Sequence, residues 1–446
     1  MKTVIMAGGK GTRISELFPD IPKPLIPIKN KAGESKPVLE WEIQSLVEQG
    51  FKEIILTVSH MADKIQDYFG NGEQLGASIT YFVEDTPLGN AGALFKMRDQ
   101  LTEPFLLLNA DAVFDVDFKR FYAAHMKKKE ECGVLATLFT HPNSHPYDSG
   151  LIVGDSLGRV ISWLTKEDSR PTYYKNRVNA GLHVIDPQLL DQSGIDAVSV
   201  GEKSPQTGKT IKVDLDRQLL KPLCNTGRMY CYDSPEYVKD MGTPERYEAV
   251  CRDYANGVVE SKNLSHKQKA IFLDRDGTIN KYVGFLRDID QFELIDGVAE
   301  AVKRINESGY LCIVVTNQPV IARGEVTREQ LEAIHMKMET ELGKQGAYID
   351  GLYYCPHHPD KGFEGEVKEL KIECDCRKPK PGLLLHAAED FNIDLTASWM
   401  IGDGDNDVGA GENAGCKTIL LSNDLENTCN ADIIARNLKE AIEQIL

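Results

Sequence analysis

Two segments of the chain share a design that limits how it can fold. Each is a run of apolar residues that ends abruptly in a loop of glycine and charged residues: "VIMAGGKGTR" begins at Val4, and "AIFLDRDGTIN" begins at Ala270. A buried strand that leads into a polar loop is typical of α/β proteins. Because the segments lie far apart and no internal repeat relates the two halves, we expect two different α/β units joined end to end.

Length and composition agree with two soluble units. The chain has 446 residues, of which 41% are hydrophobic and 27% charged, and a domain holds about 150 residues. The longest apolar runs have strand length, well below the roughly 18 residues of a membrane helix, and the N-terminus does not resemble a signal peptide. A net charge of −17 disfavours nucleic acid as a partner. Ten cysteines without a secretion signal favour a reducing, cytoplasmic compartment.

Strand-like and helix-like segments alternate along both halves. In the first half, "TVIMAGG", "EIILTVS", "FLLLNAD" and "GVLATLF" are expected to be buried strands. A helix that starts at Thr243-Pro244 and stops at Gly257 closes this half. The polar stretch that follows predicts domains at residues 1–257 and 269–446, with a linker at 258–268.

The first loop combines glycines with a permanent cation. It spans Ala7 to Arg13, and its glycines allow backbone N–H groups to approach phosphate oxygens. It is neither a Walker A loop nor a dinucleotide-binding fingerprint, because the further glycines that these motifs need are missing. Taken alone, the loop could equally be an ordinary glycine turn.

Later segments favour a metal-bound nucleotide at this loop. "PKPLIPI" places Lys23 between two prolines, and "PLGNAGAL" supplies Gly89 in a second tight stretch. "LLLNAD" ends a strand with Asp111, and "KDMGTPERY" offers Asp240 before a helix. Two such carboxylates can hold Mg²⁺ beside a triphosphate, although Asp111 alone would more often be a cap or turn residue.

Together these segments resemble the nucleotidyltransferases that make nucleoside-diphosphate sugars, over residues 1–257. That family has a GGxGTR loop, a PKP stretch, an acidic strand end and a late D-x-GTP stretch, in a Rossmann-like, GT-A-like fold. The resemblance implies that a sugar 1-phosphate oxygen attacks the α-phosphorus of a nucleoside triphosphate and that pyrophosphate leaves. Catalysis would then consist of positioning and charge neutralisation.

The same resemblance assigns roles to individual residues. It implies that the triphosphate is cradled by Gly8, Gly9, Gly11, Thr12 and Arg13. It also implies that Lys23 neutralises the phosphates and that Asp111 and Asp240 hold Mg²⁺. Gly89, in its own tight stretch, is a further expected substrate-binding residue. It implies sugar contacts at Asn179, Gly181 and Lys166. The stretch around Lys166 departs from the family because Thr165 replaces a glutamate, and a solvated lysine is the alternative.

The second loop places two aspartates one residue apart at a strand end. Asp274 can attack a phosphoryl group and form an aspartyl-phosphate. Asp276 can protonate the leaving oxygen and then activate water. A calcium-binding turn or a solvated loop is the alternative, which the preceding apolar strand and the following Gly-Thr disfavour.

Three later strand ends carry groups that complete such a site. "VVTNQ" supplies Thr316 and Asn317, whose polar groups can bind the transferring phosphoryl. "CRKPKPG" supplies two lysines, Lys378 and Lys380, and the residues alone do not say which one stabilises the intermediate. "MIGDGDND" supplies Asp403 and Asp407. Asp403 can hold Mg²⁺ together with Asp274 and the backbone carbonyl of Asp276.

From residue 269 to about 440 the sequence resembles the haloacid-dehalogenase phosphatases, with a Rossmannoid fold. "YYCPHHP" and "CDCRKPKPG" resemble the branch that contains heptose-bisphosphate phosphatase and the histidinol-phosphatase domain. In that branch a loop binds a structural zinc, here implied at Cys355, His357, Cys374 and Cys376. Three thiolates and one imidazole form a closed tetrahedral set. His358 is the alternative imidazole, and unbound cysteines are the alternative to a metal site.

"TNQPVIARG" and "FELIDGV" favour the heptose branch, in which Arg377 would grip substrate and Lys378 would stabilise the intermediate. The sequence departs from that branch at Pro319-Val320, where Ser-Gly is common. The two resemblances imply consecutive steps: removal of the 7-phosphate from heptose 1,7-bisphosphate, then transfer of GMP from GTP to heptose 1-phosphate. The expected cofactors are Mg²⁺ in both domains and Zn²⁺ in the second.

Two other interpretations are open. The first is a hexose-1-phosphate nucleotidyltransferase fused to a phosphatase for another ester, such as histidinol phosphate. The second is a regulatory nucleotide-sugar sensor, which the complete set of catalytic groups disfavours. Small-molecule substrates are expected, without nucleic-acid or membrane partners, and oligomerisation through the N-terminal domain is compatible with the sequence.

Overall fold

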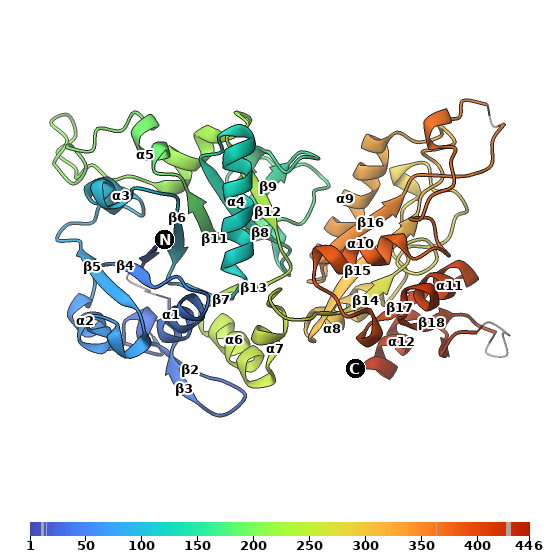
Figure 1. Ribbon diagram of the computed structural model, residues 1–446, viewed down its shortest axis with the longest axis horizontal. Helices are drawn as coiled ribbons and strands as arrows, with labels where there is room; N and C mark the ends of the chain where they lie inside the picture. Colours follow the sequence, from blue (N-terminus) through green and yellow to red (C-terminus); the bar gives the residue numbers. More distant parts are fainter. Residues whose placement is uncertain (10–12, 15, 363, 425–429) are drawn as a thin grey trace. The chain divides into compact units, whose positions relative to one another are not determined.

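The computed structural model describes residues 1–9, 13–14, 16–362, 364–424 and 430–446 (Figure 1). They form two compact units. The first comprises Met1–His141, Gly150–Thr165 and Asn179–Glu260, and the second comprises Pro142–Ser149, Lys166–Val178 and Ser261–Leu446. Two segments from the first half of the sequence thus belong to the second unit, and the backbone of Lys166–Val178 hydrogen-bonds to its helix α9 (Arg328–Lys344). The N–H of Asn176, for example, donates to Glu339 Oε2 at 3.0 Å.

A nine-stranded sheet forms the centre of the first unit. Its order is β10-β9-β11-β6-β1-β4-β5, and β8 pairs with both β11 and β12. The central strand β1 (Lys2–Met6) runs parallel to its neighbours β4 (Glu53–Val58) and β6 (Phe105–Asn109). The other strands of this sheet are β5 (Ser78–Val83), β8 (Ala136–His141), β9 (Leu151–Gly154), β10 (Val160–Leu164), β11 (Val178–Ile185) and β12 (Met229–Asp233).

Helices and two small sheets surround this sheet (Figure 1). The small sheets pair β2 (Pro27–Lys29) with β3 (Ser35–Pro37), and β7 (Ala112–Asp115) with β13 (Tyr237–Asp240). The helices are α1 (Val38–Glu48), α2 (Ala62–Phe69), α3 (Gly92–Lys96), α4 (Phe118–Cys132), α5 (Gln188–Gln192), α6 (Pro244–Asn256) and α7 (Val258–Ser261). Apolar side chains of β1 point into cores on both faces, Val4 into one and Ile5 into the other. Burial on both faces explains why the strands read as continuous apolar runs.

The second unit is built on a six-stranded parallel sheet in the order β16-β15-β14-β17-β18-β19. Its strands are β14 (Lys269–Leu273), β15 (Tyr310–Asn317), β16 (Gly351–Cys355), β17 (Trp399–Gly402), β18 (Lys417–Leu421) and β19 (Ile433–Ala435). Helices α8 (Val298–Asn306), α9, α10 (Gly382–Asp390), α11 (Asp405–Ala414) and α12 (Leu438–Ile445) flank it. The predicted α/β class is therefore confirmed for both halves.

The ends of helix α6 follow the expected signals. The Thr243 hydroxyl accepts from the Arg246 N–H at 3.4 Å, and Gly257 ends the helix with a φ of 71°. The stretch expected to be a linker is more structured than predicted. It begins with helix α7, and Val258, Val259 and Leu264 are buried, because sparse apolar residues between polar ones still reach a core. None of the helices in the described ranges has the length and apolarity to cross a membrane.

Candidate active sites and zinc cluster

Both polar loops lie where the strand order of their sheet reverses. In the first unit, β1 is flanked by β4 on one side and β6 on the other. In the second, β14 is flanked by β15 and β17. The loops that leave two such strands run to opposite faces of the sheet, which opens a crevice at their carboxyl ends. Each unit therefore presents one ligand site at the end of its central strand.

The crevice of the first unit is a cleft of about 550 Å³. Its lining includes much of the predicted nucleotide site, together with residues from β6 and from the stretch before α3: Gly8, Gly9, Arg13, Lys23, Glu84, Gly89, Asn90, Asn109 and Asp111. Gly89 has a φ of 84°, and an added Cβ would meet the Val213 carbonyl oxygen at 2.3 Å. Only glycine fits there. Gly11 and Thr12, also predicted for the phosphate cradle, lie outside the described residues.

Lys23 and Asp111 face each other in this cleft. Lys23 Nζ lies 3.4 Å from Asp111 Oδ2, with Lys23 largely buried and Asp111 60% exposed. The carboxylate is thus accessible to a ligand, and the ammonium is held beside it. Sequence reasoning missed Glu42 of α1, which is buried near both residues. Burial, and then the negative charge of Asp111, raise the pKa of Glu42 well above its usual range. An acidic residue on the buried face of the helix was the signal that could have found it.

Asp240 lies close to Asp111 because β13 pairs with β7, with Asp240 opposite Ala112. Its carboxylate accepts hydrogen bonds from Arg246 and from the N–H of Gly242, which lines the cleft. Asp240 is 41% exposed. The two predicted Mg²⁺ ligands are therefore brought to one strand pair, with Asp240 engaged by Arg246.

The predicted sugar-binding residues lie in different units: Asn179 and Gly181 belong to the first, and Lys166 belongs to the second. Gly181 of β11 lies against the side chain of Asn109, which lines the cleft. Asn179 accepts from the Gly181 N–H at 3.2 Å. Lys166, however, begins the segment Lys166–Val178 that belongs to the second unit, and it is absent from the described lining of the cleft. The predicted sugar contact of Lys166 stays a prediction.

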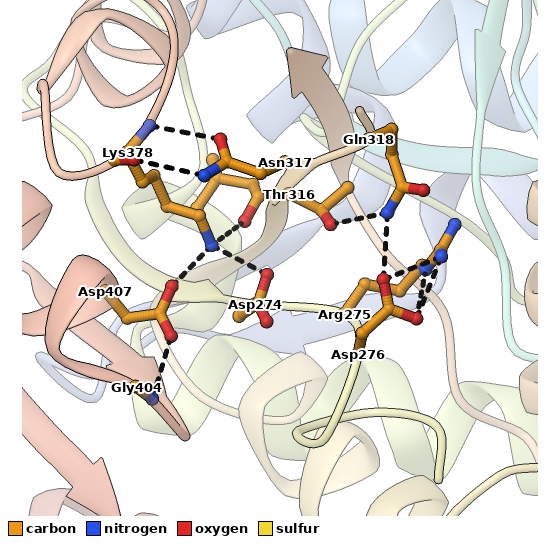
Figure 2. Close-up of polar contacts among 10 residues, drawn as sticks. Asp274, Arg275, Asp276, Thr316, Asn317, Gln318, Lys378, Gly404 and Asp407 are labelled. Atoms are coloured by element: carbon orange, nitrogen blue, oxygen red, sulfur yellow. Dashed lines mark hydrogen bonds and ion pairs between the residues drawn. The ribbon is translucent and has the colours of Figure 1, made fainter. Parts of the chain in front are cut away.

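The centre of the second site is the pair Asp274 and Lys378 (Figure 2). Lys378 Nζ donates to Asp274 Oδ1 at 2.6 Å, to the Val315 carbonyl at 2.9 Å, and to Asp407. Lys378 is buried, whereas Lys380 is 47% exposed and lies 3.9 Å from Glu373. The structure thus assigns Lys378 to Asp274, a choice that the sequence left open. Asp407, which the sequence placed at this site without a role, orients the ammonium.

Three carboxylates, those of Asp274, Asp403 and Asp407, lie within 4.8 Å of one another at this site, and Lys378 bonds to two of them, Asp274 and Asp407. Burial raises the pKa of Asp274 and of Asp403 to about 6, and the neighbouring carboxylates raise the pKa of Lys378. The three acids and one ammonium leave two negative charges uncompensated when all are ionised. A divalent cation would balance them, and oxygen ligands are those that Mg²⁺ prefers. The donor set therefore fits Mg²⁺.

A glycine sets the spacing of this cluster. Gly277 follows the two aspartates with a φ of 86°, and an added Cβ would lie 1.9 Å from Asp403 Oδ2. Any other residue would displace Asp403 from the end of β17. The Gly in the D-x-D-G-T motif is thus required by the approach of the acid on the neighbouring strand.

The Asp276 side chain points away from this cluster, toward Arg275 and Gln318 (Figure 2). Arg275 Nη2 donates to both of its oxygens, at 2.8 and 2.7 Å. Thr316 is buried and accepts from Gln318 Nε2 at 2.9 Å. Asn317 holds the backbone of Lys378: its Oδ1 accepts from the Lys378 N–H at 3.1 Å, and its Nδ2 donates to the Lys378 carbonyl. Asn317 is therefore placed to position Lys378. Its predicted contact with the phosphoryl group stays a prediction.

Cys355, His357, Cys374 and Cys376 form a second metal-type cluster, with all ligand atoms within 4.8 Å of one another. The Cys376 sulfur lies 3.2 Å from that of Cys355 and 3.3 Å from that of Cys374. Zinc–sulfur bonds of about 2.3 Å in a tetrahedron require sulfurs slightly under 4 Å apart. Hydrogen bonding with Cys355 and with its other neighbours lowers the pKa of Cys376 to about 5, the direction that favours a thiolate ligand. The set fits Zn²⁺.

His358, the alternative ligand, faces elsewhere. Its Nδ1 accepts from the Asp360 N–H at 3.2 Å, and His358 is not in the cluster. Arg377, which directly follows Cys376, donates to the His357 carbonyl at 3.3 Å. The cluster therefore holds the segment that carries Arg377 and Lys378.

Comparisons with known proteins relate each half of the chain to a family. Residues 2–257 match the family described as "Nucleotidyl transferase", and residues 226–415 match "haloacid dehalogenase-like hydrolase". The D-glycero-beta-D-manno-heptose-1,7-bisphosphate 7-phosphatase of Salmonella typhi is 46% identical over 153 residues, which are 34% of this chain and 79% of that protein. The Escherichia coli K12 protein of the same name is 47% identical over 152 residues, 34% of this chain and 78% of that protein.

Solved structures similar to each half include HddC from Yersinia pseudotuberculosis and a D,D-heptose 1.7-bisphosphate phosphatase from B. bronchiseptica. HddC has 23% sequence identity and a TM-score of 0.45, covering 57% of this chain and 99% of its own. The phosphatase, complexed with magnesium and phosphate, has 30% identity and a TM-score of 0.36, covering 40% of this chain and 98% of its own. On the sequence matches, the chain belongs to the nucleotidyl transferase family through its first half and to the haloacid dehalogenase-like family of the heptose-1,7-bisphosphate 7-phosphatases through its second.

Proposed function

We propose that the chain is a bifunctional enzyme that makes GDP-heptose. Its second unit removes the 7-phosphate of D-glycero-D-manno-heptose 1,7-bisphosphate, and its first unit transfers GMP from GTP to the resulting heptose 1-phosphate. The observation that carries the proposal is the buried Asp274–Lys378 pair, 2.6 Å apart, in a half that is 46% identical over 153 residues to a heptose-1,7-bisphosphate 7-phosphatase. The order is chemically sensible, because the anomeric phosphate must survive the first step to be used in the second.

In the phosphatase step, an oxygen of Asp274 attacks the phosphorus of the 7-phosphate, and the bond to the C7 oxygen breaks. Asp276 gives that oxygen its proton, Lys378 neutralises charge on the phosphoryl group, and Thr316 contributes a hydroxyl at the same strand edge. Water then attacks the aspartyl-phosphate, with Asp276 taking its proton, and phosphate is released. Mg²⁺ held by Asp274, Asp403 and the Asp276 carbonyl would supply positive charge to the phosphoryl oxygens.

In the transferase step, an oxygen of the sugar 1-phosphate attacks the α-phosphorus of the triphosphate, and pyrophosphate leaves. Arg13 and Lys23 face the cleft and offset the negative charge of the phosphates. Asp111 and Asp240 would hold Mg²⁺, which screens repulsion between the two phosphate groups. No covalent enzyme intermediate is needed, so positioning is the main task of this unit.

Phosphorus NMR on the full chain tests both steps in one sample. With heptose 1,7-bisphosphate, Mg²⁺ and GTP, we expect the 7-phosphate signal to be replaced by inorganic phosphate, followed by a new diphosphate signal. Phosphate release without a sugar nucleotide under any nucleoside triphosphate would refute the acceptor assignment. Turnover of hexose 1-phosphate and histidinol phosphate instead would favour the alternative fusion.

Glu84 supports guanine as the base. It is half-buried in the cleft, its Oε2 accepts from the Leu88 N–H at 3.1 Å, and burial raises its pKa. Guanine presents two adjacent donors on its Watson–Crick edge, the N1–H and the 2-amino group, and a carboxylate accepts both. Adenine, cytosine and uracil do not present this donor pair.

The substitution Glu84→Gln tests this assignment. We expect KM for GTP to rise by about 10- to 100-fold. The glutamine side chain has only one acceptor oxygen, so its NH₂ group would face one of the two guanine N–H donors. KM for ATP should change little, and phosphate release by the second unit should stay at its wild-type rate. Steady-state kinetics with both nucleotides give the comparison, and an equal change for GTP and ATP would contradict base reading by Glu84.

Removal of one cysteine tests the zinc cluster. In Cys374→Ser we expect loss of bound zinc and a destabilisation of the second unit by more than about 2 kcal/mol, because a structural zinc site contributes directly to folding. Metal analysis of the purified chain and denaturant unfolding provide the readouts. Cys416→Ala, which alters a buried cysteine outside the cluster, is the matched control and should retain full zinc content. Wild-type zinc content in Cys374→Ser would contradict the ligand assignment.

A further inference from the structure

Asp276 is held by an unusually complete set of donors. Its Oδ1 accepts from Arg275 Nη2 at 2.8 Å, from Arg275 Nε at 3.2 Å and from Asn280 Nδ2 at 3.1 Å. Its Oδ2 accepts from Arg275 Nη2 at 2.7 Å and from Gln318 Nε2 at 2.9 Å. Both oxygens are therefore fixed in direction, which a single surface ion pair would not achieve.

The arginine that dominates this set is itself immobilised. Arg275 is 0% exposed, and its Nη1 lies 3.3 Å from Nε2 of His335 on α9, which is also buried. Burial, and then the charge of Arg275, lower the pKa of His335 well below its usual range. The imidazole is therefore neutral, and its Nε2 can accept the Arg275 N–H. The guanidinium is therefore held between two groups, His335 of α9 and the Asp276 carboxylate.

Gln318 connects the Asp276 carboxylate to Thr316 at the end of β15. Its Nε2 donates to Asp276 Oδ2 and to Thr316 Oγ1, both at 2.9 Å. Gln318 is buried, and its backbone N–H donates to the Cys355 carbonyl at 2.8 Å. Asp276 is thus held in a fixed relation to Thr316 at the end of β15 (Figure 2).

We infer that Arg275 is a positioning residue for Asp276. Its buried guanidinium, in contact with His335, fixes the position of the Asp276 carboxylate together with Gln318, and this carboxylate transfers the proton in both half-reactions. This inference rests on the proposed acid–base role of Asp276. In the first half-reaction the Asp276 proton passes to the C7 oxygen as the phosphorus–oxygen bond breaks. In the second, Asp276 recovers a proton from the water that hydrolyses the aspartyl-phosphate. A carboxylate displaced by about 1 Å would serve both steps poorly.

Arginine is needed here because of its shape. A guanidinium presents its donors in a rigid planar fork, whereas the lysine ammonium is a compact point charge on a flexible stem. Arg275→Lys therefore keeps the positive charge beside Asp276 but loses the rigid group that hydrogen-bonds to both carboxylate oxygens at once. Arg304→Lys, at an exposed arginine that pairs with Glu443 at 3.3 Å, is the matched control for the same chemical change.

The test compares two esters in single-turnover experiments on the full chain. The sugar 7-phosphate has a poor leaving group that needs a proton, and 2,4-dinitrophenyl phosphate has a good leaving group that does not. In Arg275→Lys we expect phosphoryl transfer from the sugar phosphate to slow by about 10²-fold, the scale of general acid catalysis. Transfer from the aryl ester should keep its wild-type rate, with a burst of dinitrophenol before slow hydrolysis. An equal loss for both esters would overturn the inference.

A double variant separates positioning from a merely structural role. In an Asp276→Ala background, Arg275→Lys should cause no further loss with the sugar phosphate, because there is no carboxylate left to place. Additive losses would overturn the inference. If Asp276→Ala alone showed no selectivity between the esters, the proposed role of Asp276 would fail instead. Should Arg275→Lys not fold, Gln318→Leu provides the same comparison, with the same selective loss expected.

Discussion

Asp274→Asn should abolish phosphate release while leaving nucleotidyl transfer intact. Without its nucleophile the second unit should lose at least about 10⁴-fold in rate, as in other enzymes that lose a covalent catalytic group. The amide keeps the shape of the side chain, and Lys378 retains Asp407 and the Val315 carbonyl as partners. The fold should therefore survive. Supplied with heptose 1-phosphate and GTP, the variant should make sugar nucleotide at the wild-type rate.

The reciprocal change completes this experiment. Asp111→Asn should stop sugar-nucleotide formation and leave phosphate release unchanged, because Asp111 lines the cleft of the first unit alone. Inorganic phosphate and pyrophosphate, measured separately in each variant, distinguish the two outcomes. Loss of both activities in either folded variant would contradict independent sites.

Lys378→Met should be the most destabilising of the substitutions considered for the second unit. Lys378 is buried against two carboxylates and a carbonyl, so its removal leaves buried negative charge without a partner. Breaking such an arrangement costs about 3–5 kcal/mol. We expect this decrease in the free energy of unfolding of the second unit, measured by urea denaturation in the absence of Mg²⁺, together with loss of phosphate release.

Lys380→Met is the matched control two residues away. Because Lys380 is 47% exposed and its nearest acidic partner is 3.9 Å away, the change should alter the free energy of unfolding by less than about 0.5 kcal/mol. Phosphate release should also persist. Equal effects at Lys378 and Lys380 would contradict the assignment of the buried lysine as the partner of Asp274.

Much of the fold could be predicted because its strands are buried on both faces. Continuous apolar runs such as "FLLLNAD" therefore predicted β6, and the Thr-Pro start and Gly257 stop predicted α6. The membership of Pro142–Ser149 and Lys166–Val178 in the second unit could not be predicted. It depends on contacts such as that of Asn176 with Glu339, and no local pattern in either segment encodes a partner so distant in sequence.

The sites were predictable where a motif fixes both residue type and spacing. Asp274 and the cysteine cluster belong to such motifs. The sequence could not separate Lys378 from Lys380, because both are lysines in one loop and only the fold buries one of them. It also did not reveal the partner of Asp276, because an arginine inside a D-x-D motif can face either solvent or the protein. Glu42 was missed for a similar reason: its environment is made by Lys23 and Asp111, not by its neighbours in sequence.

The continuity of the cysteine cluster with Lys378 has a consequence for how the chain would respond to stress. Cys376, Arg377 and Lys378 are consecutive. Oxidants react with cysteine thiolates, and chelators would compete with them for the zinc that the cluster is proposed to hold. Damage to the cluster would therefore release the catalytic lysine and stop dephosphorylation, whereas the first unit, whose cleft has no cysteine among its described lining residues, would continue to work. Under oxidative or zinc-poor conditions we expect the bisphosphate sugar to accumulate, so that supply of the monophosphate, and not of nucleotide, limits the output of the enzyme.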